Sequence, residues 1–224
     1  MQFKKNGFFS IWLLLFGFCA ASGIVLFFCY QARIKLPDYI GRELTSQERE
    51  SIISRNSPYI QYINLTANAD FPRNSKITKI TVHHMAGDLS LEALGESFSR
   101  ADRKASANYA IDSSGQVALY VEECNRAWTS SSRDNDHQAV TVEVANDEMG
   151  GEWHVSDASY EMLVELCVDI CRRNHIRELI YTGDETGNLT IHKMFSNQTE
   201  CPGPYLESRM AELADTVTQR LNAP

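Results

Sequence analysis

The sequence predicts an α/β fold, a central mixed β-sheet flanked by helices, preceded by an N-terminal transmembrane helix. Short runs rich in β-branched residues alternate with longer segments of helical periodicity, which is typical of an α/β domain. An uncharged apolar run at residues 8–30 matches the roughly 20 residues needed to cross a bilayer. The 224 residues, 43% hydrophobic and 22% charged, suffice for this segment and one domain with a sizeable core.

The chain is acidic, with a formal net charge of -8 at pH 7. Binding to a phosphate backbone requires a basic face, so the charge argues against nucleic acid as a partner. It also disfavours tight adhesion to anionic lipid. We therefore expect a small or polymeric polar substrate.

The N-terminal 30 residues predict a membrane anchor. Residues 1–7 carry Lys4 and Lys5 and form a cytoplasmic n-region, and the apolar run at 8–30 is longer than the core of a signal peptide. A cleaved signal peptide is the alternative, because the small residues at 19–23 offer a site for a peptidase. Charge does not set the orientation, because basic residues flank both ends of the run.

Residues 31–75 are predicted to be a connector with one short helix, and residues 76–224 to be the catalytic domain. The connector contains the sequence Thr45-Ser46-Gln47-Glu48, which is a capping box and predicts a helix start. Residues 56–74 contain prolines and several asparagines, which indicates an extended segment along the domain surface.

Strands and helices alternate from Lys76 onward. Ser90 and Ser156 are expected to cap helices, and residues 206–221 have the spacing of an amphipathic helix. The turn signal at 112–115 predicts a β-hairpin. The expected strands are 77–83, 108–111, 117–121, 139–145 and 178–181.

Three side chains are candidate metal ligands. His83 ends an apolar strand, and His192 precedes Cys201 by nine positions, so the intervening loop can return the thiolate to the imidazole. Two imidazoles and one thiolate suit zinc, and three protein ligands leave the fourth tetrahedral position open for catalysis. His84 is an alternative to His83, because neighbouring side chains on a strand face opposite sides and only one can face the site.

Glu143 is an acidic residue within an otherwise apolar strand. Burying a carboxylate without a partner is costly, so its presence requires an explanation. An ion pair with Arg126 is the structural explanation. The functional one is a general base beside a metal-activated water.

Separate motifs occur in an order that identifies a family. The set resembles the zinc N-acetylmuramoyl-L-alanine amidases of the type-2 amidase family, which also contains phage lysozyme-type amidases and animal peptidoglycan recognition proteins. The resemblance runs from about Lys76 to the C-terminus. The motifs are ITVHHMAG at 80–87, SANYAI at 106–111, AWT at 127–129, VEVAN at 142–146, IH at 191–192 and TECPG at 199–203.

The resemblance implies cleavage of the amide bond between N-acetylmuramic acid and L-alanine in peptidoglycan, with Zn²⁺ as cofactor. It favours His83, His192 and Cys201 as the ligands, with Glu143 as general base. It also places Tyr109 by the metal, where it would orient the water or Glu143. Certain relatives carry Lys and others Thr at the position of Thr199, whose hydroxyl would donate a hydrogen bond to the developing oxyanion.

The substrate groove is expected beside these residues. The face of Trp128 suits contact with sugar C–H groups, and hydroxyls such as that of Thr129 suit hydrogen bonds to the peptide; a buried core tryptophan is the alternative. Asn146 begins a polar loop near the cleft. The residues assigned to substrate binding are Trp128, Thr129, His84 and Asn146.

Two functions of different class remain. The first is an enzyme in the cell membrane, held by a single span with its catalytic domain outside the cytoplasm, or secreted if the N-terminal segment is cleaved. The second is a module that binds peptidoglycan or muropeptide without cutting it. Cys201 favours the enzyme, because relatives that only bind lack this ligand.

Overall fold

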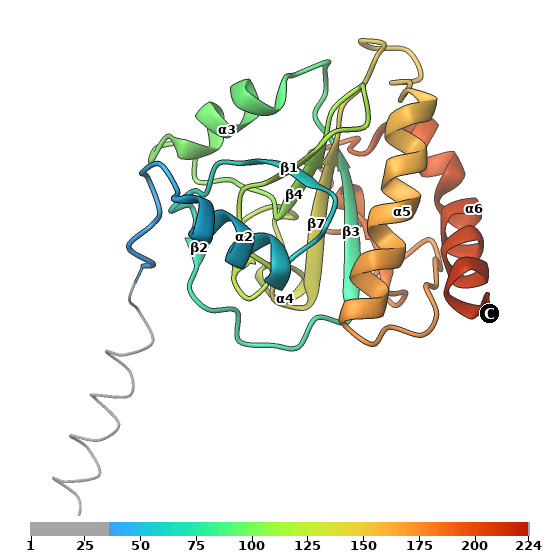
Figure 1. Ribbon diagram of the computed structural model, residues 1–224. Helices are drawn as coiled ribbons and strands as arrows, with labels where there is room; N and C mark the ends of the chain where they lie inside the picture. Colours follow the sequence, from blue (N-terminus) through green and yellow to red (C-terminus); the bar gives the residue numbers. More distant parts are fainter. Residues whose placement is uncertain (1–35, 224) are drawn as a thin grey trace, which may run out of the picture. The chain divides into compact units, whose positions relative to one another are not determined.

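A six-stranded mixed sheet forms the centre of the fold (Figure 1). The computed structural model describes residues 36–223, and the predicted membrane segment at 8–30 lies outside these residues. None of the helices in the described range combines the length and apolar character that spanning a bilayer requires. The central mixed sheet flanked by helices confirms the predicted α/β fold.

The strand order in this sheet is β1-β5-β4-β7-β3-β8. Only β4 and β5 pair antiparallel, as the predicted hairpin, and the other neighbours are parallel. A second, two-stranded sheet pairs β2 (Ala69–Asp70) with β6 (Arg126–Ala127) antiparallel. The six strands are β1 (Ile60–Ile63), β3 (Lys79–His84), β4 (Tyr109–Ile111), β5 (Val117–Leu119), β7 (Ala139–Val144) and β8 (Leu189–Ile191).

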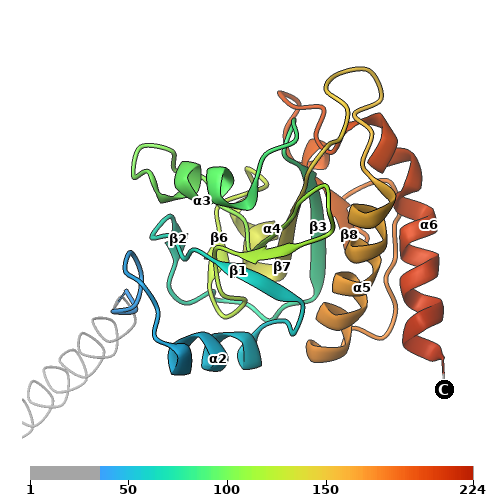
Figure 2. The same ribbon diagram turned by 45° about the horizontal axis from the view of Figure 1, so that its top comes forward.

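Two long helices, α5 (Asp157–Arg173) and α6 (Gly203–Asn222), lie side by side against one face of the sheet (Figures 1 and 2). The helix α3 (Leu91–Ser99) packs on the other face, against Tyr120 of the hairpin. The remaining helices are short: α2 (Ser46–Arg55), α4 (Arg133–Gln138) and the 3₁₀ helix η1 (His192–Met194).

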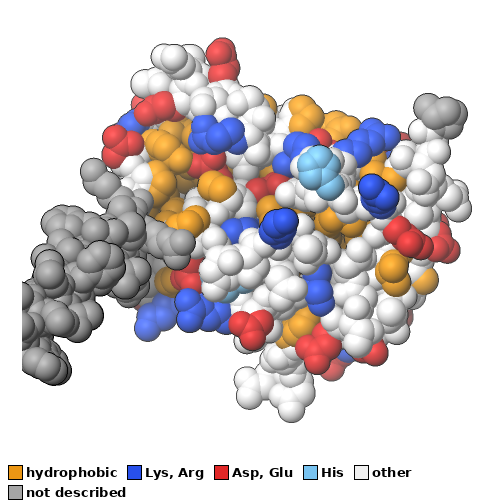
Figure 3. Space-filling view, turned by 90° about the horizontal axis from the view of Figure 1, so that it is seen from below, with side chains coloured by type: hydrophobic (Ala, Val, Ile, Leu, Met, Phe, Trp, Pro, Cys, Tyr) orange, Lys and Arg blue, Asp and Glu red, His pale blue; other side chains and the backbone are white. Residues whose placement is uncertain are grey.

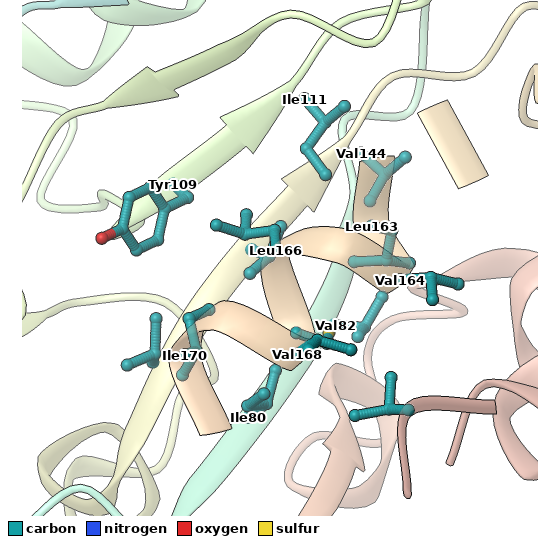
Figure 4. Close-up of a cluster of buried hydrophobic side chains, with 14 of the residues drawn as sticks. Ile80, Val82, Tyr109, Ile111, Val144, Leu163, Val164, Leu166, Val168 and Ile170 are labelled. Carbon is teal, nitrogen blue, oxygen red and sulfur yellow. The ribbon is translucent and has the colours of Figure 1, made fainter. Parts of the chain in front are cut away.

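Alternation along the central strands separates apolar from polar side chains. Ile80 and Val82 of β3 belong to the core cluster that includes α5 and α6, a part of which Figure 4 shows. The intervening Thr81 and His83 therefore point to the opposite face, where Thr81 accepts a hydrogen bond from Asn135 at 2.9 Å. The face covered by α3 and α4 thus receives the side chains that carry chemistry.

The predicted helix caps are confirmed. Thr45 and Glu48 form the capping box of α2. Ser90 accepts a hydrogen bond from the amide of Ala93 at the start of α3, and Ser156 accepts one from Ser159 at the start of α5. These bonds satisfy amides that the first helical turn leaves without partners.

The segment predicted to be a connector is part of the folded unit, which begins at Asp38. Residues 60–63 form β1 at one edge of the central sheet, and Asp70 pairs with Arg126 in the small sheet. Compact structure therefore begins well before Lys76, the predicted start of the catalytic domain. The prolines and asparagines of residues 56–74 obscured two short strands.

The predicted strand at 178–181 is also wrong, and the sixth strand is β8 instead. The backbone amide of Ile180 donates to the side-chain oxygen of Asn188 at 2.6 Å. The carbonyl of Ile180 accepts the backbone amide of Asn188 at 3.1 Å. Leu179 donates its amide to the hydroxyl of Thr218 on α6. These bonds hold the segment as a loop beside α6 rather than in the sheet.

Charged side chains of both signs are interspersed on the face at the amino ends of the parallel strands (Figure 3). Inside the domain, Glu123 is one of several buried charged residues and is 5% exposed. It accepts hydrogen bonds from Tyr109 at 2.7 Å and from Arg173 at 2.7 and 2.8 Å. This network joins β4 to the end of α5.

Removing Glu123 should therefore destabilise the domain. We expect Glu123→Ala to lower the free energy of unfolding by about 3 kcal/mol, because it leaves the buried Tyr109 hydroxyl unpaired and Arg173 with Asp169 alone. Denaturant unfolding measures this loss. Asp102→Asn, which breaks an exposed ion pair with Arg100, is the control and should have near-wild-type stability. An equal loss in both variants would contradict the role of Glu123.

Candidate metal centre and active site

The three predicted ligands converge. The ligand atoms of His83, His192 and Cys201 lie within 4.8 Å of one another. Cys201 Sγ is 3.6 Å from His83 Nδ1, and the two imidazole centroids are 4.8 Å apart. His83 and Cys201 are buried, and His192 is half-buried. Residues separated by more than 100 positions thus form one donor set.

Strand register explains this convergence. His83 lies near the end of β3, whose Val82 pairs with Ile191 of the parallel strand β8. His192 follows Ile191 directly and so emerges next to His83. Cys201 lies just before α6, where its Sγ accepts a hydrogen bond from the backbone amide of His84 at 3.3 Å. That amide anchors the third donor to the same strand as the first.

The spacing of Cys201 Sγ and His83 Nδ1 fits two ligands of a tetrahedral metal ion. A zinc ion with bonds of about 2.0 Å to nitrogen and about 2.3 Å to sulfur separates those two ligands by about 3.6 Å. The distance between Cys201 Sγ and His83 Nδ1 has this value. The Nε2 atom of His192 faces the hydroxyl of Ser131 at 3.3 Å, which leaves its Nδ1 available for a metal.

Burial sets the protonation of the donors. It lowers the pKa of His83 well below its ordinary value and also lowers the pKa of His192, so both imidazoles are neutral and able to donate a lone pair. Burial and the nearby Glu143 carboxylate raise the pKa of the Cys201 thiol well above its usual value. A bound cation would favour the thiolate form of this side chain.

The other histidine of the pair, His84, points away from the donor set. Its ring lies edge-on to Trp153, with centroids 5.1 Å apart, and its Nδ1 is buried without a hydrogen-bond partner. The structure brings His83, and not His84, to the other two donors. The backbone amide of His84 donates to Cys201 Sγ, and a contact of its side chain with substrate stays a prediction.

Glu143 lies beside His83. The two residues pair in register on the neighbouring strands β7 and β3. Burial raises the pKa of Glu143 to about 8, and its Oε2 is buried without a hydrogen-bond partner among the described residues. Arg126 instead pairs with Asp70 at 2.9 Å and with Asp136 at 3.8 Å, so the structural explanation for Glu143 does not hold. A carboxyl group with this pKa is suited to exchange protons near neutral pH.

Tyr109 does not lie by the metal ligands, so its predicted place is wrong. It is fully buried on the face of the sheet toward α5, among Ile111, Leu166 and Ile170 (Figure 4). Its neighbour Ala110 is the residue that pairs with Glu143, so the Tyr109 side chain points to the opposite face. The hydroxyl donates to Glu123, and Tyr109 is therefore part of the structural network described above.

Thr199 supports the turn that carries Cys201. Its Oγ1 accepts a hydrogen bond from the Cys201 amide at 3.1 Å. The carbonyl of Cys201 in turn accepts the amide of Lys193, which follows His192. This short-range network couples the second ligand to the third. The role of Thr199 toward an oxyanion stays a prediction.

A cleft of about 450 Å³ opens beside Glu143 and His192. Trp128 and Thr129 line it, which agrees with their predicted location, and Trp128 is half-buried. Thr129 directs its hydroxyl inward, to the carbonyl of Ser106 at 2.6 Å and to Thr141 at 2.9 Å. Its side chain therefore shapes the wall.

Asn146 has a structural hydrogen bond, and its contact with substrate stays a prediction. It is fully buried, and its side-chain amide donates to the carbonyl of Trp153 at 2.8 Å. This bond shapes the loop between β7 and α5. Trp153 in that loop lies so close to Gly203 that an added Cβ on the glycine would be 2.8 Å from the Trp153 Cβ, so the loop braces the turn after Cys201.

Sequence reasoning did not identify several residues of the cleft. The basic side chains of Arg103 and Lys104 line it, and Asp70 lies behind its wall. Arg103 and Lys104 occupy an exposed loop, where basic residues are ordinarily only solvated. Asp70 lies behind the cleft wall because β2 pairs with β6, and no local sequence pattern predicts this pairing.

The chain matches the profile of the N-acetylmuramoyl-L-alanine amidase family over residues 73–204, which is more than half of its length and includes all three donors. A comparison with curated proteins found no match.

Solved structures share the fold at low sequence identity. The hydrolase AmiA of Staphylococcus aureus, in complex with its ligand, is 16% identical, with a TM-score of 0.54, covering 84% of this chain and 95% of that one. AmpD is 18% identical with a TM-score of 0.52, covering 68% and 93% of the two chains. A mutant endolysin from Bacillus subtilis is 15% identical with a TM-score of 0.51, covering 70% and 96%.

The fold agrees with these structures, and the family match spans the residues that converge in the cleft. The chain therefore belongs to the N-acetylmuramoyl-L-alanine amidases, the enzymes that hydrolyse the amide bond between N-acetylmuramic acid and L-alanine in peptidoglycan.

Proposed function

We propose that this amidase depends on Zn²⁺, which His83, His192 and Cys201 bind, and that Glu143 is its general base. The observation that carries the proposal is the approach of these three donors to within 4.8 Å of one another, beside a cleft that Glu143 also lines. Nitrogen and sulfur donors suit zinc, and three protein ligands with an open fourth position are typical of catalytic zinc.

A zinc ion at this site would polarise the scissile carbonyl and lower the pKa of a water molecule. Glu143 would accept the proton of the attacking water and later deliver it to the nitrogen of the departing L-alanine. Its unpaired Oε2 and raised pKa support both transfers. The hydroxyl of Thr199 accepts a backbone hydrogen bond, which leaves its own proton for the developing oxyanion.

The cleft would hold the glycan and the first residues of the peptide. The half-buried indole of Trp128 offers an apolar face to the sugar ring, and Thr129 maintains the wall beside it. His84 and Asn146 would act indirectly, through the positions of Cys201 and of the loop that braces it.

We further propose that residues 8–30 anchor the enzyme in the cell membrane with the catalytic domain outside the cytoplasm. The uncharged apolar run in the sequence supports this location, and so does a substrate that lies outside the membrane. An anchor would keep the enzyme close to peptidoglycan.

Zinc binding should release more than one and up to about two protons per ion at pH 7. The two imidazoles are neutral before binding, whereas the Cys201 thiol must lose its proton and the Glu143 carboxyl group loses its own as the cation lowers its pKa. Calorimetric titration of the metal-free protein in buffers of different ionisation enthalpy measures this number.

In Cys201→Ser, the zinc affinity should fall by more than the roughly 10- to 100-fold that the loss of an outer-shell partner costs. Unchanged affinity would remove Cys201 from the site.

Glu143→Gln should retain zinc and lose activity by about 100-fold or more, because glutamine cannot accept the proton. Release of free L-alanine amino groups from purified peptidoglycan measures turnover, and metal analysis measures occupancy. The control is Glu161→Gln on the exposed side of α5, which should keep wild-type turnover. Full activity in Glu143→Gln would exclude this residue as the base.

The same variant has an expected effect on stability in the metal-free protein. The unfolded carboxyl group ionises near its ordinary pKa of 4.5, whereas the folded one retains its proton up to about pH 8. Burial of Glu143 therefore lowers stability increasingly as the pH rises from 4.5 to 8. The gain in melting temperature of Glu143→Gln should be larger at pH 7.5 than at pH 5.

Membrane attachment predicts where the protein is found and where its mature chain begins. Mass spectrometry should detect residues 1–30 in the mature protein, and fractionation should place the protein with membranes. A variant that lacks residues 1–30 should lose this association. A mature N-terminus near residue 23 would instead establish secretion after cleavage.

A further inference from the structure

Asp70 of the short strand β2 supports one wall of the cleft from behind. We infer that Asp70 is a positioning residue, which orients Trp128 and Arg126 for substrate binding. The inference rests on the proposed function only in taking this cleft, beside Glu143 and His192, as the substrate site.

Both carboxylate oxygens of Asp70 are engaged. Oδ1 accepts the indole N–H of Trp128 at 2.9 Å, and Oδ2 accepts the Nε–H of Arg126 at 2.9 Å. Arg133 also donates to Oδ2 at 3.4 Å, and the ring of His137 lies 3.7 Å from it. Bonds to an ionised acceptor are about twice as strong as those between neutral groups.

The residues that donate these hydrogen bonds, Trp128, Arg126 and Arg133, line the cleft, whereas Asp70 does not. Within residues 36–223, the Asp70 side chain accepts its hydrogen bonds from these three residues alone. Asp136, the other acid near Arg126, instead accepts the backbone amides of Thr129 and Ser130 and so holds the chain itself. The contacts of Asp70 thus act on the orientation of side chains.

The position of Asp70 is itself well determined. It pairs with Arg126 across the two strands of the small sheet. This pairing places its carboxylate beside the side chains of β6 and of the residues just after that strand. The guanidinium carbon of Arg126 lies 6.0 Å from the centre of the Trp128 ring. One carboxylate therefore sets both the tilt of the indole and the cation next to it.

Asp70 should consequently affect binding more than chemistry. On the proposed function, the reacting bond would lie at Glu143 and the metal ligands, and Trp128 would contact parts of the substrate away from that bond. Loss of Asp70 frees the indole to rotate, so KM should rise while kcat is preserved. An effect of charge alone would instead lower KM. Loss of a negative charge beside a cleft that contains Arg103 and Lys104 would favour the binding of an anionic stem peptide.

The test compares Asp70→Ala, Asp70→Asn and Asp169→Asn in the full chain, with a soluble muropeptide as substrate. The Asp169 control removes a carboxylate of similar burial, which pairs with Arg173 away from the cleft. Asp70→Ala should raise KM by at least about tenfold with kcat within about twofold. Asp70→Asn, which keeps an acceptor for the indole and lacks the charge for Arg126, should raise KM less. Asp169→Asn should have the wild-type KM.

A double-mutant cycle with Trp128→Ala tests whether Asp70 acts through the indole. In Asp70→Ala/Trp128→Ala the combined rise in KM should be clearly smaller than the product of the two single effects, because the carboxylate then has no indole left to orient and its loss acts only through Arg126. Additive effects on KM would overturn the inference. So would a wild-type KM in both Asp70 variants, or a KM lowered by Asp70→Asn at low salt.

Zinc content and melting temperature complete the test. They separate a positioning role from a general loss of structure, because retained zinc together with a raised KM supports positioning. A joint loss of zinc and kcat in Asp70→Asn would overturn it. Failure of the proposed function is recognised separately, because the wild-type enzyme would then release no L-alanine amino groups in the same assay.

Discussion

The parallel register of β3 with its two neighbours is the constraint on which the site depends. It sets His83 beside Glu143 on one side and beside the start of η1 at His192 on the other. A shift by one residue would turn every side chain of β3 to the opposite face and would remove His83 from both partners. The apolar side of the same strands, packed under α5 and α6, makes such a shift costly. The core therefore determines where the chemistry occurs.

Burial gives the donor set its character. The environment that keeps His83 neutral also raises the pKa of Cys201 and Glu143, so the site without metal is a cluster of uncharged groups. A divalent cation would reverse this for the thiol and the carboxyl group together. The hydrogen bond from the His84 amide to Cys201 Sγ is already directed to stabilise the resulting thiolate. Metal binding and the activation of the base are thus coupled through the same pocket.

Sequence reasoning identified the elements whose signals are local. The caps at Thr45, Ser90 and Ser156 follow from adjacent residues, and the three donors follow from motifs in a fixed order. Tyr109 was misplaced because alternation on β4 turns it toward α5, whereas its motif indicated only proximity to the site. Asp70 was missed because its role arises from the pairing of two-residue strands, which leave almost no pattern in a sequence.

X-ray absorption spectroscopy at the zinc edge tests the central claim most directly, because it measures the ligands of the bound ion. The account predicts one sulfur at about 2.3 Å and light-atom ligands at about 2.0 Å, two of them with the multiple scattering of imidazole, and one further oxygen at the open position. A zinc ion without a sulfur ligand, or one closed by four protein side chains, would contradict it.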